Sequence, residues 1–225
     1  MGRLRAQLRR FEGRILEEEV TSITRGENGL FELALAHDKS PLLSRTVLLC
    51  TGVRDRMPEV PGVDELCAAD LLRQCPICDG HEYSGKRIGV LGDSDHADRE
   101  AEFLRTFGAS VAVVRLMSPA GAPVAVRLAA ANGAVCVTLS DGTSQRFDVL
   151  YAALGVSPQT SLASSLQPAI DEEGNIVVDA HCRSSISGLY AAGDVVSALD
   201  QIAVAFGHGA IAATAVHNAL RSDDI

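Results

Sequence analysis

Two cysteines separated by two residues, Cys75-Pro76-Ile77-Cys78, are the part of this sequence best suited to chemistry. Thiols three positions apart can close a small disulfide ring, and this spacing helps to lower a thiol pKa so that the attacking thiolate forms. Asp79 follows directly, and its carboxyl group is a candidate proton donor to a departing thiolate. The segment therefore predicts dithiol–disulfide exchange.

A metal site is the alternative for the same segment. Cys75, Cys78 and His81 supply three ligands, whereas tetrahedral zinc usually takes four, often from two paired sets. The remaining cysteines are isolated in the sequence: Cys50, Cys67, Cys136 and Cys182. We therefore favour redox chemistry over zinc binding, and a cysteine pair without a chemical role remains a third alternative.

The composition argues against several classes of partner. The chain has 225 residues and a formal net charge of −9, which disfavours nucleic acid or an anionic membrane as the main partner. No apolar run approaches the ~20 residues of a membrane span, and the first residues lack the apolar region of a signal peptide. The irregular cysteine spacing does not resemble a disulfide framework. We expect a cytoplasmic protein.

The elements that must position these residues alternate along the chain. Helices are expected at residues 3–11, 97–107 and 201–220, with weak helical character at 118–133. Strands are expected at residues 15–24, 30–36, 46–50, 87–91, 110–115, 135–139, 147–153, 174–178 and 189–192. Glycine turns at strand ends indicate a parallel α/β sheet, which binds ligands at the carboxyl ends of its strands.

The turn Gly92 to Ala97 follows one of these strands and is a candidate nucleotide site. A dinucleotide fingerprint has the pattern G-x-G-x-x-G/A, and Ser94 stands here in place of the second glycine. Asp93 and Asp95 lie where phosphate charges should bind. A carboxylate about 4 Å from a phosphate repels it by roughly 4 kcal/mol at an effective dielectric constant of 20. The turn predicts a βαβ unit with weak nicotinamide binding, and the alternative is that these acids only cap a helix.

Two further strand ends carry a charged residue. Arg115 ends the next strand without an accompanying acid, whereas NAD recognition usually needs an acid there and NADP needs basic residues. Asp194 ends the segment Gly188 to Asp194, where its carboxylate can accept hydrogen bonds from a sugar or polyol hydroxyl. An ordinary strand-to-turn cap is the alternative for Asp194.

These pieces, in this order, resemble the low-molecular-weight thioredoxin reductase family of FAD- and NAD(P)-dependent pyridine nucleotide-disulfide oxidoreductases. The matching segments run through most of the chain: Leu49 to Gly52 with Pro58 and Pro61-Gly62, Cys75 to Gly80, Leu154-Gly155 with Pro158, Gly188 to Asp194, and Asp200 to Ala203. Each segment alone is weak evidence for the family, whereas the set of segments in this order is specific to it.

The resemblance implies residues for two cofactors. The flavin-side residues would be Gly52, Gly155, Gly193, Asp194, Gln201 and Ile202. Asp194 would hold the ribityl chain of FAD, and Gln201 and Ile202 would lie near the isoalloxazine. The nicotinamide-side residues would be Gly92, Ser94 and Arg115, through which NADPH would bind only weakly.

The resemblance also implies a catalytic cycle. A hydride would pass from NADPH to FAD, and electrons would then reach the cysteine pair and a partner disulfide, with a hinge between two domains. Cys78 would be the thiol nearest the flavin, Cys75 the thiol that meets the substrate, and Asp79 the proton donor. The partner would be a thioredoxin-like protein or a small-molecule disulfide or dithiol, and the assembly a homodimer.

The implied architecture is α/β, with two Rossmann-like three-layer domains. A nucleotide-like domain of residues 57–152, which carries the cysteine pair, would be inserted into an incomplete FAD domain of residues 1–56 and 153–225. The family begins with a βαβ unit whose G-x-G-x-x-G turn holds the FAD pyrophosphate, and nothing similar precedes Gly52. We therefore expect a chain truncated at its amino terminus that binds FAD poorly.

Two other functions stay open. The altered turn at residues 92–97 favours an FAD-dependent dithiol oxidase, or a reductase with another electron donor, that does not use NADPH. An inactive fragment or non-catalytic partner module is the second rival, and dimerisation through the apolar face of residues 201–220 would fit it.

Overall fold

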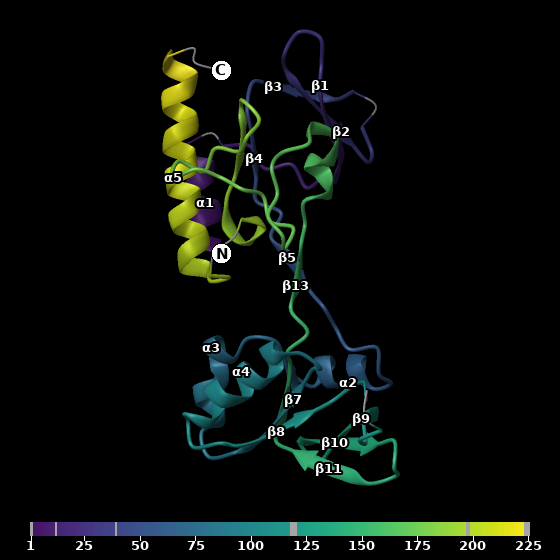
Figure 1. Ribbon diagram of the computed structural model, residues 1–225. Coiled ribbons are helices and arrows are strands. Elements are labelled where there is room, and N and C mark those ends of the chain that lie inside the picture. The colour runs from purple at the N-terminus through teal and green to yellow at the C-terminus, as the bar shows by residue number, and fades with distance from the viewer. Residues whose placement is uncertain (1, 12, 39, 118–120, 197–198, 223–225) are drawn as a thin grey trace. The chain divides into compact units, whose positions relative to one another are not determined.

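The computed structural model describes residues 2–11, 13–38, 40–117, 121–196 and 199–222. The chain forms two compact units (Figure 1): unit 1 comprises residues 1–53 and 158–225, and unit 2 comprises residues 54–157. Strands β5 (Val53–Asp55) and β13 (Val156–Pro158) pair with each other and include both points where the chain passes between the units. None of the described helices is both long and apolar enough to span a bilayer.

Unit 2 is built on a parallel sheet with the strand order β6-β12-β7-β8. Its strands are β6 (Leu72–Arg73), β7 (Arg87–Leu91), β8 (Ser110–Val114) and β12 (Val149–Ala152). Every residue of β12 is buried, as expected for a parallel strand that is covered on both faces. Helix α4 (Asp95–Arg105) connects β7 to β8, so the βαβ unit predicted from the sequence is confirmed.

Two layers cover this sheet. Helix α4 packs on one face, where Ile88, Val90, Ala101, Leu104 and Tyr151 share a core. An antiparallel sheet of β9 (Ala125–Ala131), β10 (Ala134–Leu139) and β11 (Ser144–Phe147) belongs to a second core, which includes Leu66, Leu91, Leu128, Val135, Phe147 and Leu150. The short helices α2 (Val63–Ala68), α3 (Pro76–Asp79) and η1 (Gly80–Tyr83) complete the unit.

The expected weak helix at residues 118–133 is wrong, because residues 125–131 form strand β9; residues 118–120 lie outside the described residues. Alanine favours helix, but Ala134 to Leu139 of β10 pair along almost the whole segment, and this pairing overrides propensity. Asn132 and Gly133 join β9 to β10 with φ angles of 50° and 69°. An Asn-Gly pair with two positive φ angles is a strong hairpin signal that the sequence analysis missed.

The expected strand at residues 174–178 is also wrong. Only an isolated antiparallel bridge forms there, between Ile170 and Ile176. Gly174 has a φ of 93°, and its N–H donates to the Asp171 carbonyl, so the backbone turns where the strand was expected to begin.

Unit 1 contains one parallel strand pair and one antiparallel sheet. Strand β4 (Val47–Leu49) pairs with β14 (Leu189–Ala191), and β1 (Val20–Arg25), β2 (Phe31–Leu35) and β3 (Leu42–Ser44) form the sheet. Their shared core includes Ile23, Phe31, Leu49, Ile176, Leu189 and Ala191. The remaining elements are α1 (Gly2–Arg10), η2 (Ser161–Leu166), η3 (Gly193–Val195) and α5 (Ile202–Ser222).

Helix α4 carries a carboxyl group, that of Glu100, whose pKa is raised by burial. The Oε1 atom of Glu100 lies 3.1 Å from Nε2 of His96, while Oε2 is buried without a hydrogen-bond partner. Burial raises the pKa of Glu100 from 4.5 to about 7, and burial together with the charge of Arg99 lowers the pKa of His96. The native protein therefore keeps a proton on Glu100 that the unfolded chain releases, so stability falls as the pH rises through this window.

Glu100→Gln should remove this pH dependence. At pH 8 we expect the variant to be more stable than the wild type by about 3 kcal/mol, and at pH 4 the two should match. Urea unfolding at both pH values measures the difference. Glu102→Gln is the matched control, because the Glu102 side chain is 77% exposed. A gain of equal size at both pH values would contradict the assignment.

Candidate functional site

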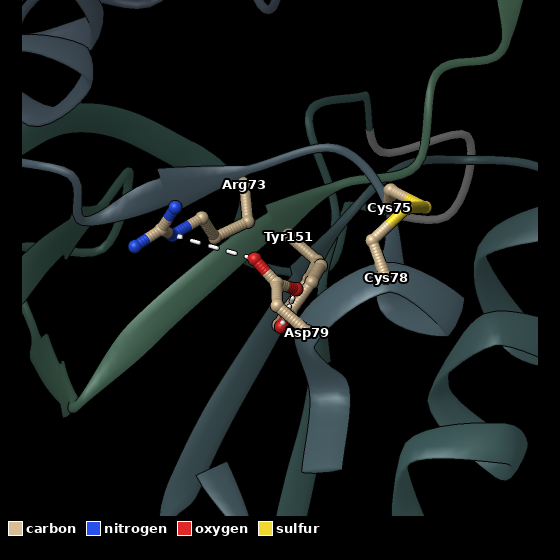
Figure 2. The surroundings of a disulfide bond; sticks show 5 residues. All are labelled: Arg73, Cys75, Cys78, Asp79 and Tyr151. Carbon is tan, nitrogen blue, oxygen red and sulfur yellow. Dashed lines mark hydrogen bonds and ion pairs between the residues drawn. A yellow bond between two sulfur atoms is a disulfide. The ribbon is translucent and has the colours of Figure 1, made fainter. Parts of the chain in front are cut away.

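The two cysteines lie at the two ends of a single helical turn. Cys75 and Cys78 are joined by a disulfide, with their Cα atoms 5.3 Å apart (Figure 2). Pro76 occupies the first position of α3, where its fixed φ suits a helix start and its missing N–H is not needed. The Cys78 N–H donates to the Cys75 carbonyl at 3.0 Å, which closes the turn. The C-P-I-C order therefore brings the sulfur atoms together by local structure alone.

Neighbouring residues fix one side of this turn and leave the other side accessible. Pro76 and Gly80 are buried, and a Cβ added at Gly80 would lie 2.9 Å from Cδ2 of Leu104 on α4. Cys75 is half-buried and Cys78 is exposed. An external thiol or disulfide can thus reach the pair.

A polar network holds Asp79. Tyr151 donates its hydroxyl to Oδ1 of Asp79 at 2.6 Å, and Nε of Arg73 lies 3.7 Å from Oδ2. Figure 2 shows the Asp79 carboxylate turned toward Arg73 and Tyr151 rather than toward the sulfur atoms. The strand register explains why these three side chains lie close together. Tyr151 of β12 pairs directly with Arg73 of β6, and α3, which carries Asp79, begins three residues after Arg73.

Sequence reasoning missed both partners of Asp79. Tyr151 lies in the buried run Val149 to Ala153, and a buried tyrosine hydroxyl usually needs a hydrogen-bond partner. That rule could have predicted that the Tyr151 hydroxyl has a hydrogen-bond partner. It could not have identified Asp79 as the partner.

Three of the cysteines outside the pair have thiol pKa values above the ordinary value. Burial raises the pKa of Cys50, Cys67 and Cys182, which reduces their thiolate fraction near neutral pH. Among the described residues no group of three or more His, Cys, Asp and Glu side chains is arranged to hold a metal ion. The His81 ring, the third candidate ligand, packs edge-on against Phe107 with 5.7 Å between centroids.

The turn at residues 92–97 is tightly packed and acidic. A Cβ added at Gly92 would lie 2.8 Å from both the Ala153 carbonyl oxygen and Cβ of Ala97, so glycine is needed for packing. The Asp93 carboxylate accepts the N–H groups of Leu116 and Met117 at 2.8 and 3.0 Å. Ser94 precedes α4 without capping it through its side chain.

Arg115 is already paired at this turn. Its guanidinium donates to both carboxylate oxygens of Asp98, at 2.8 and 3.0 Å, and to the Gly92 carbonyl at 3.0 Å. A nucleotide phosphate there would meet the carboxylates of Asp93, Asp95 and Asp98 and a neutralised cation. These residues do not fit the pyrophosphate of a nicotinamide nucleotide.

Several flavin-side residues gather in unit 1. Gly52 follows β4 and Gly193 follows β14, and since Leu49 pairs with Ala191 both lie at the same carboxyl edge. Their φ angles of 67° and 76° are left-handed, which glycine adopts without strain. Asp194 follows Gly193, and no residue in the described ranges pairs with its carboxylate.

The start of α5 lies against this edge. A Cβ added at Gly193 would contact Cβ of Ala205 at 3.5 Å, which places the first turn of α5 beside η3. Gln201 precedes α5, and the Ile202 side chain is 73% exposed. Gly155, by contrast, belongs to unit 2, where its carbonyl accepts the Arg56 N–H.

The chain is similar to known redox proteins. Residues 121–209 match the family model described as pyridine nucleotide-disulphide oxidoreductase. The chain is 31% identical to a component of the alkyl hydroperoxide reductase of Pseudomonas putida, over 88% of this chain and 42% of that protein. It is 30% identical to thioredoxin reductase of Schizosaccharomyces pombe, over 85% of this chain and 68% of that protein.

The fold is shared with a solved enzyme of the same kind. Thioredoxin reductase from Streptococcus pyogenes matches with a TM-score of 0.83 and 25% identity, over 98% of this chain and 79% of that chain. The predicted α/β class is therefore confirmed. The chain spans about half or less, 40% to 51%, of the length of three curated relatives that it matches. With its ordered motifs and its Cys75–Cys78 disulfide, the chain belongs to the pyridine nucleotide-disulphide oxidoreductase family and is thioredoxin reductase-like.

Proposed function

We propose that the chain is a flavin-dependent dithiol–disulfide oxidoreductase of thioredoxin reductase type. The accessible Cys75–Cys78 disulfide in a member of this family is the observation that carries the proposal. The remaining cysteines are single thiols in the structure. The pair is thus the element of the chain that can accept and pass on two electrons.

The proposed reaction has two balanced halves. First, two electrons and two protons convert the Cys75–Cys78 disulfide to two thiols. Then the thiolate of one cysteine attacks a substrate disulfide, and the departing substrate thiolate takes up a proton. The second cysteine attacks the resulting mixed disulfide, which releases the other substrate thiol and restores the ring. Following the resemblance, Cys75 attacks the substrate and Asp79 carries the proton, although Cys78 is the more exposed residue.

Membership of the family implies a flavin and a nicotinamide cofactor. For the flavin, taken to be FAD, Asp194 would hold the ribityl hydroxyls, and Gly52, Gly193, Gln201 and Ile202 would line the same edge of unit 1. A bound flavin would supply the two electrons that open the disulfide. The residues that the resemblance assigns to NADPH, Gly92, Ser94 and Arg115, lie in unit 2, residues 54–157, and as described above they do not fit a nucleotide pyrophosphate.

The acidic turn supports a second candidate. Because the residues at 92–97 do not fit a nucleotide pyrophosphate, a dithiol oxidase or a reductase with a non-nicotinamide donor agrees better with this part of the chain. In that version dithiols would reduce the Cys75–Cys78 disulfide, and the electrons would flow toward the flavin.

The partner and the setting are also proposals. The S. pombe relative is named thioredoxin reductase, which supports a thioredoxin-like protein as substrate, and small disulfides remain candidates. The irregular spacing of the cysteines, which does not resemble a disulfide framework, supports a cytoplasmic location. The exposed apolar side chains of α5, Ile202, Phe206 and Ile211, support a homodimer.

A visible spectrum tests the proposal and separates its two versions. The purified chain is mixed with FAD, passed through gel filtration, and titrated without oxygen with NADPH and then with dithiothreitol. Retained flavin that NADPH bleaches supports the reductase, and flavin that only the dithiol bleaches supports the second candidate. Loss of all flavin on the column, together with no reduction of a disulfide substrate, would reject both.

A further inference from the structure

A groove in unit 1 lies between the second half of α5 and the segment of residues 180–190 that leads into β14. It consists of two hollows of about 270 and 560 Å³, and Arg183 and Asn218 line both of them. The hollows are therefore neighbours along one groove. The volume of the larger hollow alone falls within the range typical of small-molecule sites.

The smaller hollow is lined by donors that have no partner. Tyr190 is only 4% exposed, yet its hydroxyl makes no hydrogen bond within the part of the chain that the structure describes. A buried tyrosine hydroxyl usually has a partner. The backbone N–H groups of Ser187 and Gly188, which line the same hollow, also make no hydrogen bond to any described residue. The smaller hollow thus offers three unused donors to a ligand.

Arg183 supplies a positive charge where the two hollows meet. Its guanidinium makes no hydrogen bond or ion pair with the described residues. The carboxylate of Asp179, in the same loop, interacts with the charge of Arg183. That carboxylate lines neither hollow and already accepts the backbone N–H groups of His181 and Arg183, at 2.8 and 2.9 Å. The guanidinium fork therefore remains available to an anion.

The surrounding charges favour an anion as well. Among the described residues neither hollow is lined by Asp or Glu, although the chain has 29 acidic residues and a net charge of −9. Arg25 donates from Nη1 to the Ser187 carbonyl at 3.1 Å and so brings a second guanidinium to this end of the groove. The carboxyl end of α5 has an opposing effect, which is weaker than a charge-assisted hydrogen bond.

The larger hollow has a different lining. Four of its eight lining residues are apolar: Ala180, Ala210, Ile211 and Ala215. The polar residues Arg183 and Asn218 lie at its junction with the smaller hollow, and the Asn218 side chain makes no hydrogen bond to a described residue. The groove therefore changes along its length from polar and cationic to largely apolar.

We propose that this groove binds a small organic acid with an anionic head group and an apolar chain. The head group, a carboxylate or a phosphate monoester, binds in the smaller hollow to Arg183, the Tyr190 hydroxyl and the N–H groups of Ser187 and Gly188. The chain lies along the apolar wall of the larger hollow. The site is separate from the cysteine pair, which belongs to unit 2, and does not depend on the proposed oxidoreductase function.

Isothermal titration calorimetry of the full chain with octanoate and with octyl phosphate tests the site. At least one of the two should bind with a stoichiometry of one, and the tighter one identifies the preferred head group. Octanol, which keeps the chain and lacks the charge, should bind at least tenfold more weakly. Acetate and inorganic phosphate, which lack the chain, should also bind at least tenfold more weakly, because each buried methylene favours binding.

Two variants test the residues that hold the head group. Arg183→Gln should weaken binding of the tighter ligand by about tenfold or more, and Tyr190→Phe by a factor on the order of ten. Arg221→Gln is the matched control, because Arg221 is exposed in the last turn of α5 and lines neither hollow. Its affinity should stay within about twofold of the wild type. Thermal unfolding without ligand checks that each variant is folded, and the exposed Arg183 is the position least sensitive to this concern.

The proposal would be overturned if neither octanoate nor octyl phosphate bound at millimolar concentration. Equal affinities of the wild type and Arg183→Gln would also overturn it, as would octanol binding as tightly as octanoate. Equal binding of acetate and octanoate would reject the apolar half of the site. No flavin, nucleotide or disulfide substrate enters these titrations, so the proposed function stands or falls separately in the spectral titration.

Discussion

Replacing both Cys75 and Cys78 by serine is expected to abolish disulfide reduction by this protein, with a loss of roughly 10⁴-fold or more. A serine hydroxyl neither attacks a disulfide at neutral pH nor stores two electrons as a sulfur–sulfur bond. The rest of α3 should persist, because Pro76 and the packing of Gly80 against Leu104 do not involve the sulfurs. The measurement is the reduction of a small aromatic disulfide by the FAD-loaded protein with a reductant.

Cys67→Ser is the control for this double substitution. Cys67 lies on α2 of the same unit, and burial raises its pKa, so its loss should leave the rate within about twofold. Full activity in the double variant would show that Cys75 and Cys78 are not the redox pair. The two single variants then assign the roles: only the one that keeps the attacking thiol should accumulate a mixed disulfide with the substrate.

Gly62→Ala is expected to destabilise unit 2 by about 3–5 kcal/mol. Gly62 has a φ of 101°, and a Cβ there would lie 1.8 Å from the carbonyl oxygen of Leu128 and 2.7 Å from its carbonyl carbon. Both neighbours are backbone atoms of β9, which cannot rotate away, and the Leu128 N–H is already bonded to the Pro61 carbonyl at 2.8 Å. Urea unfolding followed by circular dichroism measures the loss, and hydrogen exchange locates it in residues 54–157.

Gly85→Ala measures the cost of a positive φ angle without a steric clash, and so separates the two causes that act together at Gly62. Gly85 has a φ of 71°, but a Cβ there would meet no atom within 4 Å. The expected loss is therefore only the left-handed penalty, about 1–2 kcal/mol. Equal losses in the two variants would show that β9 moves aside easily and that the contact at Leu128 is not tight.

The local parts of the fold could be predicted because short segments encode them. The C-P-I-C turn needs only a proline at its first helical position, and β7, α4 and β8 follow from buried strand patterns around a glycine turn. Residues 125–131 could not be assigned from propensity, since alanines that favour helix are held as a strand by their pairing with β10. The Asn132-Gly133 turn was the local signal for that hairpin.

The candidate site likewise has features that could be predicted from the local sequence and features that depend on the tertiary structure. The sequence by itself determined the cysteine pair, the adjacent Asp79, the glycines at strand ends and, through their order, the family. Only the tertiary structure decided that Arg115 is neutralised by Asp98, which lies 17 residues away along the chain. It also decided that Asp79 is held by Tyr151, 72 residues away, because β12 pairs in parallel with β6 and β7 and so places Tyr151 next to Arg73. Contacts of this kind depend on strand order and register, which non-local packing sets and residue spacing does not encode.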